Sequence, residues 1–352
     1  MSNPAPAPPP APAPGHGPLL EIRDLTVLFT VPDGVARAVD GIDLTVGEGE
    51  TVGLVGESGC GKSVTALAVL RLVEPPGHIA HGSSVRLEGR DLLALGAKEI
   101  RAVRGNHVAL VFQEPLSALD PVLRIGDQVA EAIRAHEHVS RGTARWRAVE
   151  MLTAVGIPDA PRHAAAYPHQ LSGGMRQRAL IAMALACHPK LLLADEPTTA
   201  LDVTIQAEIL ELLDSLQQRL GMAVLLITHN LGIVAERTRR VYVMYAGQIV
   251  EEAATEQLFS RPSHPYTEGL MGAVPSLDEK KDRLQAVPGQ VPPATAWPSG
   301  CRFHPRCPHA WEKCQKEMPD LLDVTPGHKA RCWLVEEPER REKRGVRGET
   351  AA

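Results

Sequence analysis

Aromatic residues are scarce in this 352-residue chain, at 3% of the sequence, and no apolar run reaches the roughly 18 residues that a membrane-spanning helix needs. The best candidate, from Ala179 to Cys187, is far too short, so any role at a membrane is expected to depend on partner subunits. The sequence also lacks a dense block of Lys and Arg before its C-terminal tail, and its formal net charge is -5. Nucleic acid is therefore not expected as the main partner.

The N-terminus lacks the basic start and the apolar stretch of a secretory signal. Residues 1–18 hold eight prolines and neither Lys nor Arg, so we expect a disordered, Pro/Ala-rich tail there. Without an export signal, the six cysteines are expected to face a reducing cytoplasm. In that compartment thiols more often bind metal, catalyse or stay inert than form disulfides.

The remaining composition suits one large folded domain with appendages, since 44% of residues are apolar and 22% are charged. Strand-like segments at 19–30, 50–56, 107–112, 190–194 and 223–228 are separated by helical patterns. That alternation predicts an α/β fold with a mostly parallel sheet.

Residues 116–170 interrupt this rhythm with helical stretches such as 124–136 and 146–155 and without a clear strand. We therefore expect a helical subdomain, spanning about 116–180, inserted into an α/β domain that covers 19–260.

The composition changes again after residue 260. Residues 261–335 are Pro-rich, cysteine-bearing and irregular in pattern, and they predict a small C-terminal module. Residues 336–352 are a dense mixture of charges, which predicts a solvated tail.

Residues 56–63 fit the pattern G-x-x-x-x-G-K-[ST], between an apolar strand and a helical stretch. In that context the glycines let backbone N–H groups wrap phosphates, Lys62 reaches the β/γ oxygens and Ser63 holds Mg²⁺. A plain glycine-rich turn is the alternative, and the flanking strand and helix favour the phosphate site. The residues predicted to bind nucleotide are Gly56, Glu57, Ser58, Gly59, Cys60, Gly61, Lys62, Ser63 and Val64.

A second apolar strand ends in two adjacent carboxylates, Asp195 and Glu196. Asp195 suits a Mg²⁺ ligand, directly or through water, and Glu196 is placed to polarise an attacking water. A strand that simply ends in solvated acids is the alternative. The phosphate loop in the same chain favours the catalytic interpretation.

Residues 171–178 read LSGGMRQR, a serine able to cap a helix followed by two glycines that leave the backbone open. Such a helix N-terminus offers N–H groups to a phosphate. The segment resembles the signature sequence of ATP-binding-cassette (ABC) ATPases, and the resemblance covers roughly residues 20–260. It implies a P-loop NTPase core with an inserted helical subdomain. It also implies that Ser172, Gly173 and Gly174 contact ATP held by a partner cassette.

The other motifs of this family appear in the family's order. Gln113 resembles the glutamine that contacts Mg²⁺ and water, and Asp202 lies in a loop that resembles the one crossing to the partner cassette. His229 resembles the histidine that contacts the γ-phosphate; a lone histidine is more often structural, but its position after a predicted strand and downstream of the two carboxylates favours the functional interpretation. Phe29 is the one nearby aromatic residue that can stack on adenine, and a core position is its alternative.

Segments 264–267, 287–292 and 300–308 resemble the C-terminal region of oligopeptide, dipeptide and nickel importer ATPases. The resemblance implies an ATPase that energises peptide uptake, peripheral to the cytoplasmic face of the inner membrane. Its implied partners are two transmembrane permeases, a second ABC ATPase, identical or different, and an extracytoplasmic solute-binding protein. Import of nickel or another small solute is one alternative. A non-transport ABC ATPase acting on nucleic acid or the ribosome is another, which the single phosphate loop and the acidic charge disfavour.

Four cysteines of the C-terminal region stand in the spacing C-x5-C-x6-C-x17-C. They are Cys301, Cys307, Cys314 and Cys332. Some peptide-importer ATPases that the chain resembles carry a [4Fe-4S] cluster in this region, and the resemblance implies that these cysteines ligate one. A zinc site, two disulfides and four free thiols are the alternatives. The C-x2-C pairs typical of zinc sites are absent, and disulfides are disfavoured in the cytoplasm.

Overall fold

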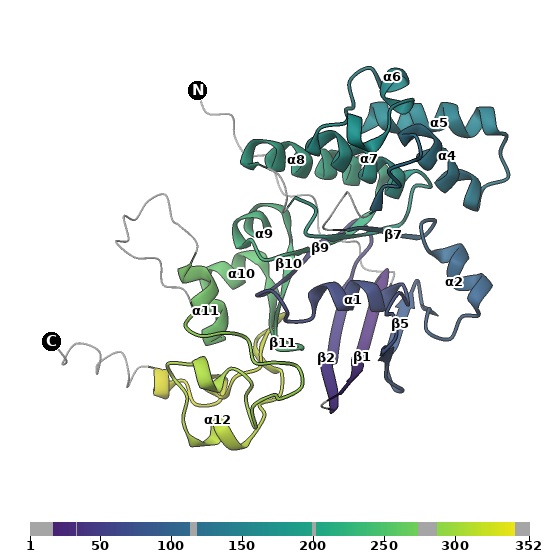
Figure 1. The fold of residues 1–352 in the computed structure, drawn as a ribbon. Coiled ribbons are helices and arrows are strands. Elements are labelled where there is room, and N and C mark those ends of the chain that lie inside the picture. The colour runs from purple at the N-terminus through teal and green to yellow at the C-terminus, as the bar shows by residue number, and fades with distance from the viewer. Residues whose placement is uncertain (1–16, 33, 113–117, 199–201, 274–286, 342–352) are drawn as a thin grey trace, which may run out of the picture.

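The computed structural model describes residues 17–32, 34–112, 118–198, 202–273 and 287–341 (Figure 1). The strands are β1 Leu20–Val31, β2 Gly34–Val46, β3 Thr51–Val55, β4 Gly77–Ile79, β5 Ser84–Leu87, β6 Arg90–Asp91, β7 Val108–Val111, β8 Leu191–Asp195, β9 Ala223–Thr228, β10 Arg240–Tyr245, β11 Gln248–Ala254, β12 Leu322–Thr325 and β13 His328–Ala330. The helices are α1 Lys62–Val69, α2 Ala97–Val103, α4 Ile125–His136, α5 Arg141–Ala154, α6 Ala160–Ala164, α7 Gly173–Leu185, α8 Val203–Leu220, α9 Leu231–Arg237, α10 Thr255–Ser260, α11 Pro265–Gly272 and α12 Glu312–Lys316. Short 3-10 turns cover Pro168–Gln170, His304–Arg306 and Trp333–Val335.

The larger sheet has eight strands in the order β12-β13-β11-β10-β3-β9-β8-β7. Its strands from β10 to β7 run parallel, whereas β11, β12 and β13 are antiparallel to their neighbours. Parallel strands end at one edge of a sheet, and α/β proteins bind ligands there. The carboxyl ends of β3, β8 and β9 therefore place the phosphate loop, Asp195 and His229 along a single edge.

The larger sheet is buried on both faces, as near-continuous apolar strands require. Leu193 and Leu225 pack with β1, β2 and α1 in one cluster, while their neighbours Leu192 and Leu226 pack with α4, α5, α7 and α8 in another. Figure 1 shows the helices α4–α8 on one side of this sheet and β1 and β2 on the other. The predicted α/β fold with a mostly parallel sheet is confirmed.

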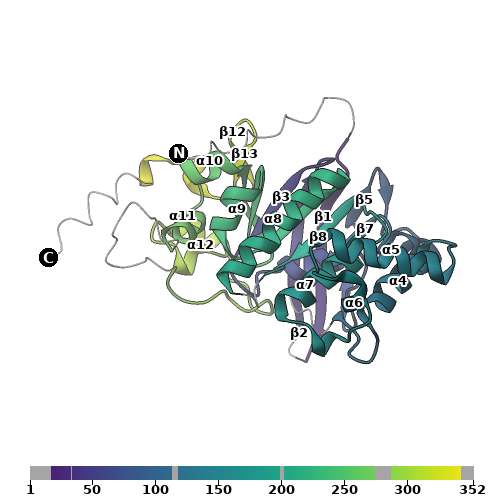
Figure 2. The same ribbon diagram turned by 90° about the horizontal axis from the view of Figure 1, so that it is seen from above.

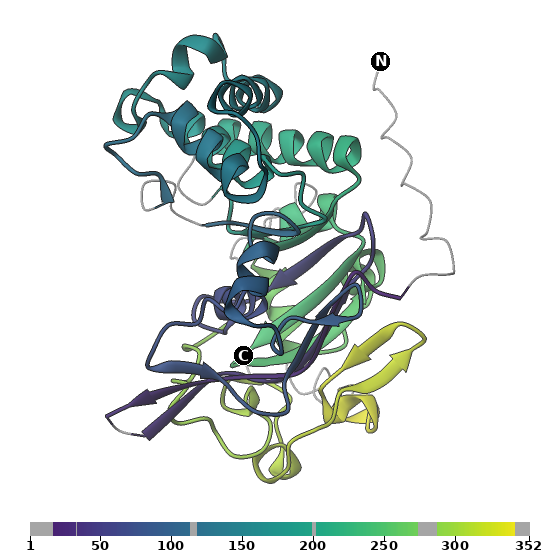
Figure 3. The ribbon, with the colours of Figure 1, turned by 90° about the vertical axis from the view of Figure 1, so that its right-hand side faces the viewer.

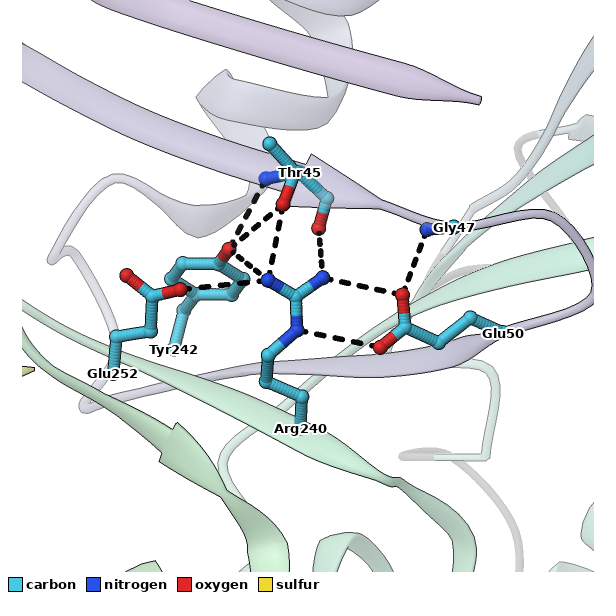
Figure 4. Close-up of polar contacts among 6 residues, drawn as sticks. All are labelled: Thr45, Gly47, Glu50, Arg240, Tyr242 and Glu252. Carbon is cyan, nitrogen blue, oxygen red and sulfur yellow. Dashed lines mark hydrogen bonds and ion pairs between the residues drawn. The ribbon is translucent and has the colours of Figure 1, made fainter. Parts of the chain in front are cut away.

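The smaller sheet is antiparallel, in the order β2-β1-β5-β6, with β4 also paired to β1. One guanidinium joins it to the larger sheet (Figure 4). Arg240 at the start of β10 donates to the Oε2 of Glu50 at 3.1 Å, to the Thr45 carbonyl at 2.9 Å and to the Tyr242 hydroxyl at 2.9 Å. Glu252 on β11 completes the group, with an oxygen 3.4 Å from the guanidinium.

Replacing Arg240 with Met is expected to lower the free energy of unfolding by about 2 kcal/mol, because the mostly buried carboxylate of Glu50 then loses its charged partner and keeps the Gly47 N–H. The side chains of Arg240 and Glu50 are only 25% and 14% exposed. Urea unfolding measures the effect. The matched control is Arg145→Met, whose ion pair with Asp127 is 69% and 42% exposed and should be worth under about 1 kcal/mol. Equal losses in the two variants would contradict this account of the joint.

The helices α4, α5 and α6 lie at one end of the molecule, and the C-terminal strands and α12 lie at the other, in all three views (Figures 1, 2 and 3). Helix α4 matches the stretch predicted at 124–136, and Ser140 caps α5 by accepting from the Thr143 backbone N–H. The predicted strands at 50–56, 107–112, 190–194 and 223–228 are likewise confirmed within one or two residues.

The C-terminal segment, residues 261–335 and described except for 274–286, contributes to the larger sheet. Its strand β13 pairs with β11 and its strand β12 pairs with β13. The prediction of an irregular module from the sequence therefore omitted two strands. Within the described part of the chain, no helix combines the length and the apolar character needed to cross a membrane.

Candidate functional site

The phosphate loop connects the end of β3 to the start of α1 and depends on glycine geometry. Gly56, Gly59 and Gly61 have φ angles of +156°, +79° and +112°. A Cβ atom on Gly56 would lie 2.2 Å from the Met244 carbonyl oxygen, and one on Gly61 would lie 2.4 Å from that of Ala38. Side chains are therefore excluded at both positions, and the loop can turn its N–H groups outward.

Lys62, the first residue of α1, is 5% exposed and lies against the loop. Its ammonium group donates to the Gly56 carbonyl at 2.8 Å and to the Glu57 carbonyl at 3.0 Å. Ser58 and Ser63 are exposed beside it. The arrangement holds one positive charge at a helix N-terminus that faces solvent, which suits a phosphate group.

Asp195 ends β8 as a buried carboxylate, 8% exposed. Burial raises its pKa, and a hydrogen bond from the Ser63 hydroxyl and the charge of Lys62 oppose that shift. Its Oδ1 atom is buried and has no hydrogen-bond partner among the described residues. An unpartnered carboxylate oxygen next to a serine hydroxyl fits a divalent cation with oxygen ligands, so these residues are suited to Mg²⁺.

Glu196 follows at once in a strained conformation, with φ +47° and its backbone N–H donating to the Ile227 carbonyl at 2.9 Å. Left-handed backbone is uncommon outside glycine and is found often at functional sites. The Glu196 Oε1 atom lies 3.0 Å from Nδ1 of His229, which follows β9. The structure thus brings together Lys62, Asp195, Glu196 and His229 on one edge of the larger sheet.

The residues predicted to contact the partner cassette lie at the starts of α7 and α8. Ser172 is exposed and caps α7 by accepting from the Met175 N–H at 3.3 Å. Asp202 caps α8 in the same manner, accepting from Ile205 at 3.0 Å. Gly173 is exposed, whereas a Cβ on Gly174 would lie 2.9 Å from Ile205, so α7 and α8 pack closely there.

Phe29 lies on β1, where its half-buried ring sits over Gly77; a Cβ added to that glycine would lie 2.5 Å from the ring. The ring therefore packs against the core, and no structural observation brings it to the phosphate loop. Val64 packs on the same core from α1. Gln113 lies outside the described residues.

Two residues at the site escaped the sequence analysis. Tyr266 and Arg306, both in the C-terminal segment, hydrogen bond to Glu57 of the phosphate loop. Since 209 and 249 residues separate them from Glu57, no local sequence pattern predicts these contacts. The available signal was that Tyr266 and Arg306 lie in the segments 264–267 and 300–308, which resemble the C-terminal region of peptide importer ATPases.

The four cysteines of the C-terminal segment line one apolar cavity of about 10 Å³. Burial raises the pKa of Cys301 to about 11 and those of Cys307 and Cys332 to about 12, so these thiols are protonated near neutral pH. All six cysteines of the chain are free. The cavity offers no more room than about one water molecule needs.

Comparison with known proteins points to one family. Residues 39–199 match the family model "ABC transporter", and residues 250–314 match "Oligopeptide/dipeptide transporter, C-terminal region". The "Probable peptide ABC transporter ATP-binding protein y4tR" of Sinorhizobium fredii is 52% identical over 91% of this chain and 96% of its own length. The "Oligopeptide transport ATP-binding protein AppD" of Bacillus subtilis is 49% identical over 91% of this chain and 97% of its own.

Solved structures agree with these relatives. The ATP-binding cassette MJ0796, solved as a dimer in a post-hydrolysis state bound to ADP and Pi, has a TM-score of 0.60 and 28% identity. The match covers 67% of this chain and 98% of that one. The protein cbiO1 from Clostridium perfringens, part of the transporter complex cbiONQ, has a TM-score of 0.59 and 25% identity, with 69% and 91% covered.

The predicted [4Fe-4S] cluster at Cys301, Cys307, Cys314 and Cys332 is wrong. Among the described residues, no three His, Cys, Asp or Glu side chains are placed to hold a metal ion, which counts against the zinc alternative as well. The relatives are named as peptide ABC transporter ATP-binding proteins with no mention of a cluster. The physical reason is geometric: the cavity that these four side chains line has room for about one water molecule, which is too small for a cluster.

Proposed function

Since this chain belongs to the ABC transporter family and is an ATPase coupled to transport, we propose that it energises uptake of dipeptides and oligopeptides through partner membrane permeases. The observation that carries the proposal is the alignment of Lys62, Asp195, Glu196 and His229 along one sheet edge. The match of residues 250–314 to the oligopeptide/dipeptide transporter region supports peptide as the solute. Nickel, nucleic acid and the ribosome are not favoured, because the named relatives are peptide transport proteins.

Each residue of this edge receives a separate task. Lys62 binds the β- and γ-phosphates. Its ammonium group then donates to phosphate oxygens in place of the two loop carbonyls that it contacts in the structure. Ser63 and Asp195 would hold Mg²⁺, together with Gln113 by family resemblance, and the ion would supply positive charge next to the transferred phosphoryl group. Glu196 accepts a proton from the attacking water, and its contact with His229 orients both side chains.

The partners follow from the same family. We propose two transmembrane permeases, a second ABC ATPase and an extracytoplasmic solute-binding protein, with this chain peripheral to the cytoplasmic face of the membrane. The domain of residues 19–260 carries the nucleotide site, and α4, α5 and α6 belong to its inserted helical subdomain. The C-terminal segment is an accessory module of that domain.

Reconstitution tests the proposed function. The full chain is assembled with its permeases in proteoliposomes, and phosphate release is followed together with uptake of a labelled dipeptide or pentapeptide. We expect ATP-dependent peptide uptake that needs the solute-binding protein. ATP hydrolysis accompanied by nickel uptake, with no peptide uptake, would refute the peptide assignment.

Ser172 is proposed to act across the dimer, on ATP held by Lys62 of the other cassette. Its exposure at the N-terminus of α7 leaves the helix end open to a partner. Variants of the homodimer carrying either Lys62→Ala or Ser172→Arg should regain ATPase activity when mixed, because a mixed dimer keeps one intact composite site. If the two lesions affected sites within single chains, no mixed dimer would contain an intact site. A mixture no more active than either parent would therefore oppose the trans arrangement. If the natural partner is a different ATPase, one substitution is made in this chain and the other in the partner chain.

A further inference from the structure

Glu57, the second residue of the phosphate loop, is held at every one of its polar groups. Its N–H donates to the Tyr266 hydroxyl at 2.8 Å, and its carbonyl accepts from Lys62 at 3.0 Å. Its two carboxylate oxygens accept from Arg306 at 2.7 and 2.9 Å. Its carbonyl also accepts from the Cys60 backbone N–H at 3.3 Å, so two of its four partners come from the C-terminal segment and two from the loop and the start of α1.

The contact with Tyr266 fixes one particular peptide plane. The Gly56 carbonyl and the Glu57 N–H belong to the same peptide unit, and the carbonyl accepts from Lys62 while the N–H donates to Tyr266. A rotation of this plane breaks both hydrogen bonds together. The carbonyl that positions Lys62 is therefore oriented, through one rigid amide, by a tyrosine 209 residues away.

Arg306 engages all five of its N–H donors. Apart from the two bonds to Glu57, it donates to the carbonyls of Pro288, Val287 and Gly289 at 2.7, 3.2 and 3.4 Å, and its Nη1 also lies 3.4 Å from the Tyr245 hydroxyl. The Arg306 side chain is 5% exposed and that of Glu57 is 28% exposed. A bidentate pair this far from solvent has a fixed geometry that a surface ion pair lacks.

Tyr266 and Arg306 pack against a cluster of aromatic side chains. Tyr266 and Phe303 lie 5.4 Å apart between ring centroids, and both contact Tyr245 at the end of β10. Because β10 pairs with β3, this cluster rests on the strand pair from which the loop emerges. Tyr266 is fully buried, so its hydroxyl has little freedom to leave the loop.

We infer, on the basis of the proposed ATPase function, that the C-terminal segment positions the phosphate loop for ATP, with Arg306 and Tyr266 as positioning residues that hold Glu57. The segment preorganises the loop, so ATP does not have to order it on binding. Linkage makes the effect reciprocal: bound nucleotide fixes the loop and thereby tightens the C-terminal segment. ATP affinity is the property that this coupling controls, since both residues hold Glu57 of the phosphate loop.

The first test is the affinity of the full chain for a fluorescent ATP analogue. Arg306→Gln is expected to raise its Kd about tenfold and the KM for ATP similarly, with kcat within about twofold. Tyr266→Phe keeps the aromatic cluster, removes only the hydroxyl and should raise Kd about threefold. The matched controls are Arg302→Gln and Tyr242→Phe. Arg302 is an equally buried guanidinium of the same segment that pairs with Asp40, and the Tyr242 hydroxyl accepts from the Thr45 backbone N–H at the sheet joint.

Hydrogen–deuterium exchange gives a second readout that does not depend on turnover. In the wild-type chain, the ATP analogue should slow exchange in residues 287–335, and Arg306→Gln should abolish that protection at saturating nucleotide. The inference is overturned if Arg306→Gln and Arg302→Gln change Kd equally, or if Tyr266→Phe binds as the wild type does and nucleotide protection persists in Arg306→Gln. A wild-type chain that binds no ATP analogue would instead defeat the proposed function.

Discussion

Replacing Glu196 with Gln should leave ATP binding intact and lower the rate of hydrolysis at least about 100-fold. The amide keeps the size of the carboxylate, and its oxygen can still lie within reach of His229, which is 3.0 Å away in the structure. It cannot accept a proton from the attacking water. The variant is therefore expected to accumulate as an ATP-bound closed dimer, detected by gel filtration with ATP and by single-turnover phosphate release.

A surface carboxylate provides the matched control for this variant. Glu88→Gln makes the same chemical change at a side chain that is 43% exposed and paired with Lys190 away from the sheet edge. It should turn over ATP at the wild-type rate. Normal turnover in Glu196→Gln would remove Glu196 from the chemical step and leave His229 as the residue to examine next.

The parallel core was predictable because its strands are buried on both faces. Residues 191–194 and 223–227 are apolar without alternation, which is typical of strands in a sheet covered on both sides. Chain order then indicated the site, since Asp195 is the last residue of β8, His229 follows β9 directly and Lys62 follows β3 through the phosphate loop. Their meeting at one edge follows from the topology of parallel strands rather than from any similarity among the motifs.

Other features depend on contacts that a local pattern does not contain. Glu196 has a left-handed backbone, and its N–H donates to the Ile227 carbonyl on the neighbouring strand β9. The strands β12 and β13 form because the edge of β11 is available to them. Arg306 was not singled out by any motif, and it is the fold that places its guanidinium on Glu57.

The cysteine prediction failed at a different step. Spacing identified four side chains that do gather in space, around a single cavity. It could not reveal how little space lies between these side chains, about 10 Å³, or that no three potential ligands among the described residues are placed to hold a metal ion. Proximity of thiols is thus a weaker criterion for a metal site than their relative placement and the space between them.

Lys62→Ala is expected to weaken ATP binding about 100-fold or more and to abolish measurable turnover, because a buried ammonium at the phosphate site contributes charge-assisted bonds that water cannot replace. Lys62 is 5% exposed, and no other described Lys or Arg side chain donates to the Gly56 or Glu57 carbonyl. Isothermal titration with ATP and Mg²⁺ measures the affinity, and the assembled transporter provides the turnover rate. Lys190→Ala, which removes a 49% exposed ammonium from the Glu88 ion pair, should bind ATP as the wild type does. If the two lysine variants bound ATP equally well, the charge at the loop would not be what holds the phosphates, and the remaining attraction would have to come from the backbone N–H groups of the loop and of α1.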